Sequence, residues 1–170
     1  MSRELLVLRH GKSGLAAIGQ DDFDRTLTKR GHRATQRMAH WVASEAIKPD
    51  AVVSSPAMRT TQTSEIFAAE IGLGEPIQWA PSIYEASVQT LLNVLASLTL
   101  VPRQMIVGHN PGMEGLIYLL CAEVPNPPDG NLVPTCALAR ISLPDDWSQL
   151  SPGCGTLLSV TRPRDLEDKT

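Results

Sequence analysis

Three short apolar runs constrain the fold of this chain more than any other feature of its sequence. They cover residues 5–8, 51–53 and 105–107, and each leads into a stretch that contains glycine or proline. Short unbroken apolar runs bounded by such residues are typical of strands buried on both faces, as in a parallel sheet. The sequence therefore predicts a central sheet with these three strands in its interior.

Helical patterns separate the predicted strands. Apolar residues recur at helical spacing after Thr28, which is a favourable N-cap residue, and again over 91–98. Two more helices are expected from about 58 to 71, where Gly72 follows, and from about Pro111 onward. Alternating strands and helices indicate right-handed β-α-β units, with helices covering both faces of the sheet.

The C-terminal part has a different pattern. Apolar residues alternate with others through 136–143, as in a half-buried strand, and 156–161 is its expected partner across a turn-rich stretch. We therefore expect a three-layer α/β/α fold with a mostly parallel central sheet and at least one antiparallel C-terminal strand. No internal repeat or linker interrupts the sequence, which predicts a single domain over 1–170.

Residues 123–134, which are rich in Pro, Asn and Gly, should form an irregular loop. One interpretation is a plain connection between two elements. The other is a wall or lid of the substrate site, because loops of this length are often functional. The sequence leaves both interpretations open.

Composition argues against several classes of partner. The net charge of −3 gives no global basic field for nucleic acid or an anionic membrane. No apolar run approaches the roughly 18–20 residues of a membrane span, and the N-terminus lacks the apolar core of a signal peptide. Three cysteines without a C-x-x-C pair indicate reduced thiols. We therefore expect a cytoplasmic protein without nucleic-acid or membrane partners.

Polar side chains gather where the predicted strands end. Arg9 and His10 follow the first strand, Arg59 comes shortly after the second, and His109 follows the third. The carboxyl ends of the strands form the ligand-binding edge of an open α/β sheet. Imidazole and guanidinium groups converging there suit a phosphate dianion, since a neutral imidazole can attack phosphorus and cations can stabilise the transferred group. Such a site needs no metal and no cofactor.

Five segments, in chain order, resemble motifs of the histidine phosphatase superfamily, whose fold is called phosphoglycerate mutase-like: Arg9-His10-Gly11; 24–28 with Gly31, where Thr26 replaces the usual proline; 54–63, which fits S-S-P-x-x-R-x-x-Q-T; 108–112; and 162–166. The last segment resembles the closing segment of the SixA-like branch, the phosphohistidine phosphatases. The short length of the chain also points to that branch. Longer members carry insertions that enclose a small substrate. A compact chain is expected to leave an open site, suited to a phosphohistidine displayed on another protein.

The resemblance implies roles for individual residues. His10 is the expected nucleophile, and the residues expected to hold the phosphoryl group are Arg9, Arg25, Arg59 and His109. Glu85 stands near the position of the carboxylate that protonates the leaving group in larger members; otherwise it is a surface carboxylate that caps the following helix. The resemblance leaves the roles of Lys12 and Ser13 open, because the residues after the signature glycine vary across the family.

The favoured function is a metal-independent phosphatase that forms a phosphohistidine enzyme intermediate and acts on protein phosphohistidine. One alternative is a phosphatase of small phosphoesters with the same catalytic core. Another is a phosphate-binding module without turnover. The expected partner is accordingly a phosphorylated protein or a small phosphorylated substrate.

Other polar clusters have simpler interpretations. The acidic run at 21–24 is interpreted as a solvated loop rather than a metal site, because metal ligands must converge. A basic cluster is most simply the solvated face of the first helix, with a docking surface for an acidic partner as the alternative: Lys29, Arg30, Arg33 and Arg37. Residues 11–13 are not the end of a P-loop, since Leu6 stands where the first glycine is required.

Overall fold

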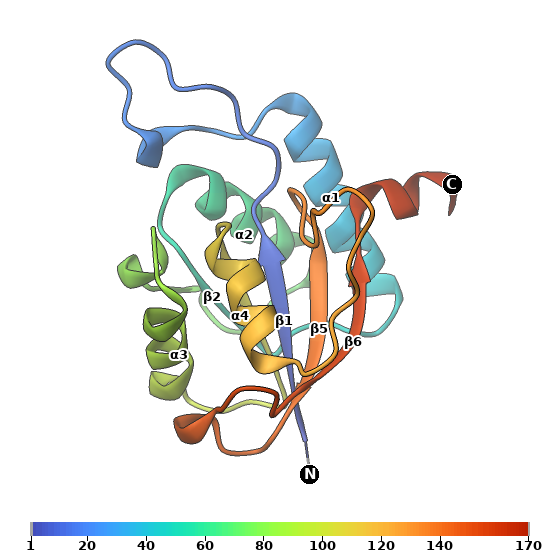
Figure 1. The fold of residues 1–170 in the computed structure, drawn as a ribbon. Coiled ribbons are helices and arrows are strands. Elements are labelled where there is room, and N and C mark those ends of the chain that lie inside the picture. Colours follow the sequence, from blue (N-terminus) through green and yellow to red (C-terminus); the bar gives the residue numbers. More distant parts are fainter. Residues whose placement is uncertain (1, 170) are drawn as a thin grey trace.

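The computed structural model describes residues 2–169, which form a six-stranded sheet with helices on both sides (Figure 1). The strands are β1 (Arg3–Arg9), β2 (Ala51–Ser54), β3 (Gln78–Trp79), β4 (Arg103–Gly108), β5 (Leu138–Leu143) and β6 (Thr156–Thr161). Their order across the sheet is β3-β2-β4-β1-β5-β6. The predicted interior strands therefore lie side by side, with β4 between β2 and β1.

Most of the sheet is parallel. β4 pairs in parallel with β1 and with β2, and β2 pairs in parallel with β3. β5 is antiparallel both to β1 and to β6, so it alone among the six described strands runs in the opposite direction. The predicted mostly parallel sheet with an antiparallel C-terminal strand is confirmed. The short strand β3 was not predicted, because two exposed residues carry no periodic pattern.

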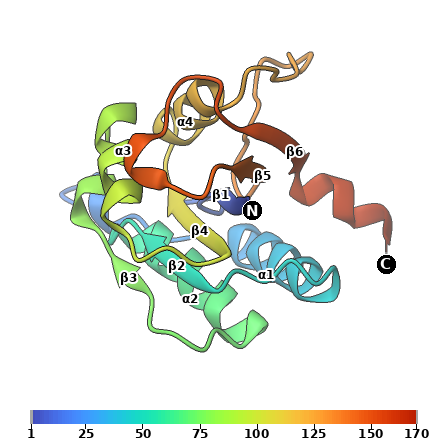
Figure 2. The ribbon, with the colours of Figure 1, turned by 90° about the horizontal axis from the view of Figure 1, so that it is seen from below.

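Helices cover both faces of the sheet. The α-helices are α1 (Lys29–Ser44), α2 (Met58–Ile71), α3 (Val88–Ser97) and α4 (Gly112–Leu120). Seen along the sheet in Figure 2, α1 and α2 lie on one face, and α3 and α4 lie on the other. Four 3-10 helices complete the elements: η1 (Asp22–Asp24), η2 (Pro81–Ile83), η3 (Trp147–Gln149) and η4 (Pro163–Lys169).

The first strand explains why the apolar runs are unbroken. Leu6 and Leu8 pack in the core under α1 and α2, whereas Leu5 and Val7 pack in the core under α3 and α4. All four side chains are fully buried. Successive side chains of a strand point to opposite faces, so a strand covered on both faces must be apolar at every position.

The helix boundaries follow from local chemistry. The Thr28 hydroxyl accepts a hydrogen bond from the backbone N–H of Gly31 at 2.9 Å, as an N-cap does. Helix α2 spans the predicted 58–71 and ends at Gly72, whose φ of 66° lies in the left-handed region that glycine adopts readily. Both predicted helix boundaries are confirmed.

The long connection at 123–134 contains neither helix nor strand, as predicted. The three cysteines form no disulfide. No helix within residues 2–169 combines the length and the apolar character needed to cross a membrane.

Candidate active site

The strand register brings the two predicted histidines together. Arg9 at the end of β1 is paired with Gly108 at the end of β4. The residue that follows each strand is a histidine. The rings of His10 and His109 lie with their centroids 5.3 Å apart. Parallel pairing in this register therefore places two imidazoles side by side at the carboxyl edge of the sheet.

His10 is buried, and its ring has a defined hydrogen-bond partner. Its Nδ1 lies 2.7 Å from the carbonyl oxygen of Gly11. A carbonyl oxygen only accepts, so Nδ1 carries the proton and the lone pair of the neutral ring lies on Nε2. Burial lowers the pKa of His10 to about 4, and the nearby charges of Arg59 and Arg9 act in the same direction. The ring is thus a neutral imidazole at pH 7.

His109 is held by a hydrogen bond to Ser55, the residue that follows β2. Its Nε2 lies 2.8 Å from the Ser55 hydroxyl, and its Nδ1 is a buried atom without a hydrogen-bond partner among the described residues. Burial lowers the pKa of His109 to about 3, and the neighbouring His10 and Arg59 lower it further. A second neutral imidazole therefore faces the first.

Arg59 lies in the first turn of α2, where the helix dipole disfavours a cation. Its two outer nitrogens donate to Asp22, at 2.7 Å to the backbone carbonyl and 2.9 Å to the carboxylate Oδ2. The guanidinium also lies 5.9 Å from the ring centroid of Tyr84. The carboxylate of Asp22 therefore offsets the unfavourable placement of this buried arginine.

Asp22 joins three of the site's side chains. Its carboxylate accepts hydrogen bonds from Tyr84 Oη at 2.6 Å, from Arg25 Nη1 at 2.8 Å and from Arg59. These bonds, that from Tyr84 first, hold the pKa of Asp22 well below its usual range, and the same bond raises the pKa of Tyr84 to about 12. The acidic run is exposed, as expected for a solvated loop, but the sequence analysis did not predict the hydrogen bonds of Asp22. The signal that sequence reasoning missed is its spacing of three residues from Arg25.

Arg25 and Ser13 lie on the same side of the site. Arg25 Nη2 donates to the Ser13 hydroxyl at 2.9 Å, and its Nε donates to the carbonyl of Gly14 at 2.7 Å. Ser13 therefore positions Arg25, a role that the sequence analysis did not assign. Lys12 lines a separate groove.

Arg9 contacts the 123–134 loop. Its Nη1 donates to the carbonyl of Val133 at 3.2 Å, and its buried Nε has no hydrogen-bond partner among the described residues. Val133 N–H in turn donates to Glu114 Oε1 on α4 at 2.9 Å. The loop is thus attached to the site, which favours the interpretation of a site wall over that of a plain connection.

The long 54–63 motif holds the other segments in place. Thr63 Oγ1 accepts from the backbone N–H of Gly11 at 3.1 Å, and Gln62 Oε1 accepts from that of Leu27 at 2.8 Å. A Cβ on Gly11 would lie 2.6 Å from Thr35 Oγ1, so this position requires glycine for close packing. Gln62 and Thr63 thus hold neighbouring segments in place and are not among the residues that line the cavity.

Beside the two histidines is an open cavity of about 440 Å³. Its lining residues come from four parts of the chain: Asp22, Arg59, Tyr84, Glu85, Ala86, His109, Asn110, Pro111 and Gly112. Glu85 is exposed and has a φ of 56°, an unusual conformation for a residue other than glycine. The structure therefore brings Glu85, Arg59 and His109 to one cavity, with Arg9 and His10 adjoining it and Arg25 joined through Asp22.

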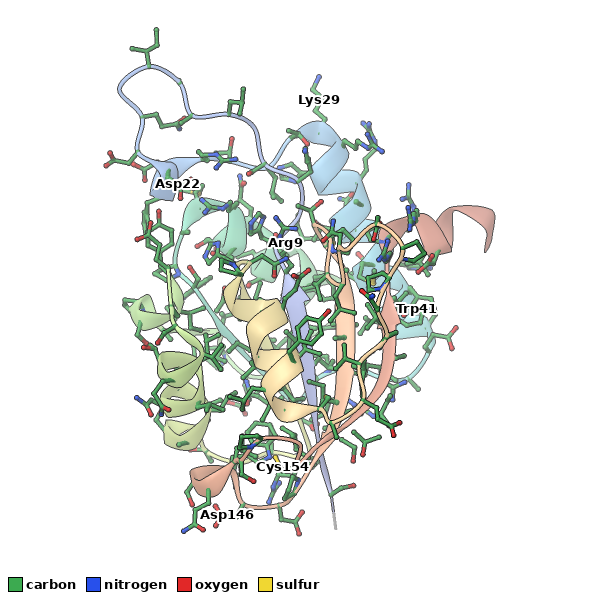
Figure 3. All side chains as sticks on the ribbon, viewed as in Figure 1. Arg9, Asp22, Lys29, Trp41, Asp146 and Cys154 are labelled. Atoms are coloured by element: carbon green, nitrogen blue, oxygen red, sulfur yellow. The ribbon has the colours of Figure 1, made fainter. Side chains whose placement is uncertain are left out.

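Figure 3 shows the same arrangement on the whole molecule: Arg9, Asp22 and Lys29 all lie toward the end of the sheet at which β1 ends. No group of three or more His, Cys, Asp or Glu side chains within the described part of the chain is placed to hold a metal ion.

Two imidazoles and three arginines at the carboxyl edge of a three-layer α/β/α sheet define a class of α/β protein whose site suits a phosphoryl group. The chain belongs to the histidine phosphatase superfamily (branch 1), whose family model matches residues 5–92. The sequence-based assignment to this superfamily is confirmed.

Several relatives cover nearly the whole chain. Phosphohistidine phosphatase SixA of Escherichia coli is 27% identical over 158 residues, which are 88% of this chain and 94% of that protein. An uncharacterized protein of Mycobacterium tuberculosis is 28% identical over 165 residues, covering 92% of this chain and all of that protein.

Solved structures of SixA proteins are also similar to this chain. A structure from Agrobacterium tumefaciens assigned as phosphohistidine phosphatase SixA has a TM-score of 0.82 and 29% identity, covering 96% of this chain and 99% of that one. A protein histidine phosphatase SixA complexed with tungstate has a TM-score of 0.81 and 26% identity, with the same coverage. The predicted SixA-like branch is confirmed.

Proposed function

We propose that this protein is a phosphatase that removes the phosphoryl group from phosphohistidine on other proteins, with His10 as nucleophile. The observation that carries the proposal is the hydrogen bond from His10 Nδ1–H to the Gly11 carbonyl at 2.7 Å. It orients the ring and leaves the Nε2 lone pair available beside Arg9, Arg59 and His109. The likeness to the SixA–tungstate complex supports the proposal, since tungstate is a tetrahedral oxyanion like phosphate.

The reaction has two steps. In the first, the His10 Nε2 lone pair attacks phosphorus, the P–N bond of the substrate breaks, and the leaving imidazole keeps the electron pair and takes up a proton from solvent. In the second, water attacks the phosphorus of the phosphorylated His10 and gives up a proton to solvent. The bond between phosphorus and Nε2 breaks, which releases inorganic phosphate and the free ring. Arg9, Arg25, Arg59 and His109 are proposed to hold the oxygens of the phosphoryl group, where arginine provides charge in a fixed planar fork.

A phosphoramidate substrate places little demand on acid catalysis. Imidazole is a far better leaving group than an alkoxide, so protonation by an enzyme carboxylate is less important for phosphohistidine than for a phosphoester. Glu85 lies on the cavity with Arg59 and His109, and we propose it as the proton donor when the substrate is a phosphoester. This placement is the observation that favours small phosphoesters as the second candidate function.

The decisive experiment compares substrates and one variant. The wild-type protein, assayed with a chelator present, is expected to hydrolyse a phosphohistidine protein and to form an acid-labile phosphoenzyme. His10→Ala should lose both, with a rate at least about 1,000-fold lower. The matched control is His40→Ala, which removes an imidazole whose side chain is 77% exposed on α1 and should leave both unchanged.

Three outcomes separate the alternatives. Full turnover by His10→Ala would contradict the nucleophile assignment. Faster hydrolysis of small phosphoesters than of phosphohistidine protein, with strong dependence on Glu85→Gln, would favour the second function. Phosphate binding without hydrolysis of any phospho-compound would instead indicate a binding module.

A further inference from the structure

A second hollow, half of whose lining residues are basic, adjoins the active site on the side of α1. This basic groove, of about 530 Å³, is formed by the exposed face of α1, the 129–135 part of the long loop and the start of η4. Its charged lining residues are Lys12, Arg30, Arg33, Arg37, Asp129, Arg162 and Arg164. None of the proposed roles of His10 or its phosphate-holding residues uses this groove.

The groove concentrates positive charge in an otherwise acidic protein. The chain has 15 Lys and Arg residues and 18 Asp and Glu residues. Among the side chains that the structure describes, six cations and one carboxylate line the groove, a net charge of +5, while the other charged residues of the sequence sum to −8. An acidic ligand is thus attracted to this surface.

The cations of the groove are arranged along a surface rather than around a point. Arg30, Arg33 and Arg37 recur at a spacing of three and four residues, which places them on one face of α1 over a length of about 10 Å. Arg162 Nη1 pairs with Asp129 at 3.0 Å on the other wall, and Arg164 approaches the same carboxylate at 3.9 Å. Asp129 thus pairs with arginines of this wall, and the exposed Arg30 and Arg33 lie on the helix wall.

The groove begins where the active site ends. Lys12, two residues after the proposed nucleophile, is part of its lining. The long loop contributes Asn131 and Pro134 to the groove, while the carbonyl of Val133 between them accepts the hydrogen bond from Arg9. A chain segment lying in the groove would therefore bring its neighbouring residues to the catalytic cavity.

Exposure distinguishes this groove from a site for a small anion. A compact anion is held by buried groups that converge, as Arg59 does with a side chain only 8% exposed. Arg30 and Arg33 are exposed, and the Arg164 side chain is 68% exposed. Spread, solvated cations attract an acidic surface at a distance but do not enclose a single phosphate.

We propose that the basic groove docks an acidic segment of the protein that carries the phosphohistidine, next to the residue that enters the cavity. This inference rests on the proposed function and adds to it the chemistry of the substrate's surroundings. For the basic cluster on α1, the proposal favours a docking surface for an acidic partner over a face that is only solvated.

Three peptides of equal length, each with one chemically phosphorylated histidine, test the proposal. Their flanking residues are Asp and Glu, Gly and Ser, or Lys. For the wild-type protein at low ionic strength, kcat/KM for the acidic peptide should exceed that for the neutral peptide by about tenfold, and the ratio should fall as salt is added. The basic peptide should be the poorest substrate.

The variant Arg30→Glu/Arg33→Glu should abolish or reverse this order while leaving hydrolysis of the neutral peptide within about twofold. The matched single reversals are Arg33→Glu in the groove and Lys48→Glu, an exposed cation just before β2 at the opposite end of the sheet. Arg33→Glu should reduce the preference for the acidic peptide, and Lys48→Glu should retain it.

Binding of the unphosphorylated acidic peptide, followed by fluorescence anisotropy, separates this inference from the proposed function. If no peptide is hydrolysed, the proposed function fails, and weaker binding by Arg30→Glu/Arg33→Glu with unchanged binding by His10→Ala still supports docking. An unchanged preference and unchanged binding in the double variant would overturn the docking proposal. Tight binding of tripolyphosphate without discrimination among the peptides would also overturn it, in favour of a small-anion site.

Discussion

The catalytic cavity and the basic groove use the same side chain, arginine, in two different environments. Arg59 is buried, and its outer nitrogens donate to the carbonyl and the carboxylate of one residue, Asp22. Arg30 and Arg33 are exposed and lie apart along a helix. Because charge interactions strengthen as water is excluded, the first arrangement can hold one group firmly. The second supplies a field that salt weakens.

Burial also makes the cavity dependent on its own anion. A buried guanidinium without a partner is costly, and here Asp22 pairs with Arg59 and with Arg25. In the groove, Asp129 pairs with Arg162, whereas Arg30 and Arg33 are exposed to solvent. The two regions therefore differ in what a substrate must do: it competes with an internal carboxylate in the cavity, and with water and salt in the groove.

Removing one arginine from each region should separate the two roles most strongly. With a small phosphoramidate as substrate, Arg59→Ala is expected to lower kcat/KM by about 100- to 1,000-fold, because a buried cation that stabilises the transferred group is lost. Arg33→Ala should change the same parameter by less than about twofold. Steady-state kinetics on both purified variants measures this contrast. Similar losses in the two variants would contradict the division into cavity and groove.

The junction between the two regions should be sensitive to a single methyl group. Gly31 lies in the first turn of α1, and a Cβ there would stand 2.1 Å from the backbone oxygen of Lys12. Backbone cannot move aside as a flexible side chain can, so Gly31→Ala should lower the free energy of unfolding by about 2–3 kcal/mol despite the better helix propensity of alanine. Urea denaturation measures it.

The control for that substitution is Gly14→Ala, because a Cβ at Gly14 would meet nothing within 4 Å. Its free energy of unfolding should stay within about 0.5 kcal/mol of the wild-type value. Equal stabilities of the two variants would show that the close approach of α1 to Lys12 is not a constraint.

Sequence patterns predicted the parts of the molecule that depend on local chemistry or on burial of whole strands. The unbroken runs that include Leu5–Leu8 and Met105–Val107 could only be buried strands, and their carboxyl ends placed His10 and His109 on one edge. The ring-to-ring distance of 5.3 Å required the register of β1 with β4, which side-chain patterns do not specify when both faces are apolar.

Contacts between distant loops were not predictable in the same way. Asp22 and Tyr84 are 62 residues apart, and their hydrogen bond depends on where the 14–26 segment places Asp22. The same holds for the basic groove, whose walls come from α1 and from η4. The positive charges were visible in the sequence, but only the fold showed that they share one hollow.

Asp22 provides a test of competition inside the cavity. Asp22→Ala removes the carboxylate that occupies Arg59 and Arg25, so we expect tungstate to inhibit this variant at about three- to tenfold lower concentration. Competitive inhibition of phosphoramidate hydrolysis gives the constant for each protein. Asp24→Ala removes an exposed carboxylate two residues away and should not change it. Weaker tungstate inhibition in Asp22→Ala would mean that the carboxylate positions the arginines more than it competes with the substrate.

The effect of pH on His10 tests whether its ring is buried. The expected change, in the protonation of this ring in mild acid, is the smallest of those predicted. The pKa of His10 is about 4 because the ring is buried, whereas a histidine in water has a pKa of about 6.5. A lowered pKa means that the neutral ring persists as the pH falls. At pH 5, roughly one tenth of His10 should be protonated, against about 97% of an ordinary imidazole. Mild acid should therefore leave the nucleophile almost intact, with its loss setting in only near pH 4.

Ring C–H resonances of His10, followed by NMR from pH 8 to pH 3.5, would give the midpoint directly. Arg59→Ala should raise that midpoint only partly toward the ordinary value, because burial is the larger cause and the arginine's charge the smaller. A wild-type midpoint near 6.5 would show that water reaches the ring freely. The cavity would then resemble the groove in the one property, burial, by which we distinguish them.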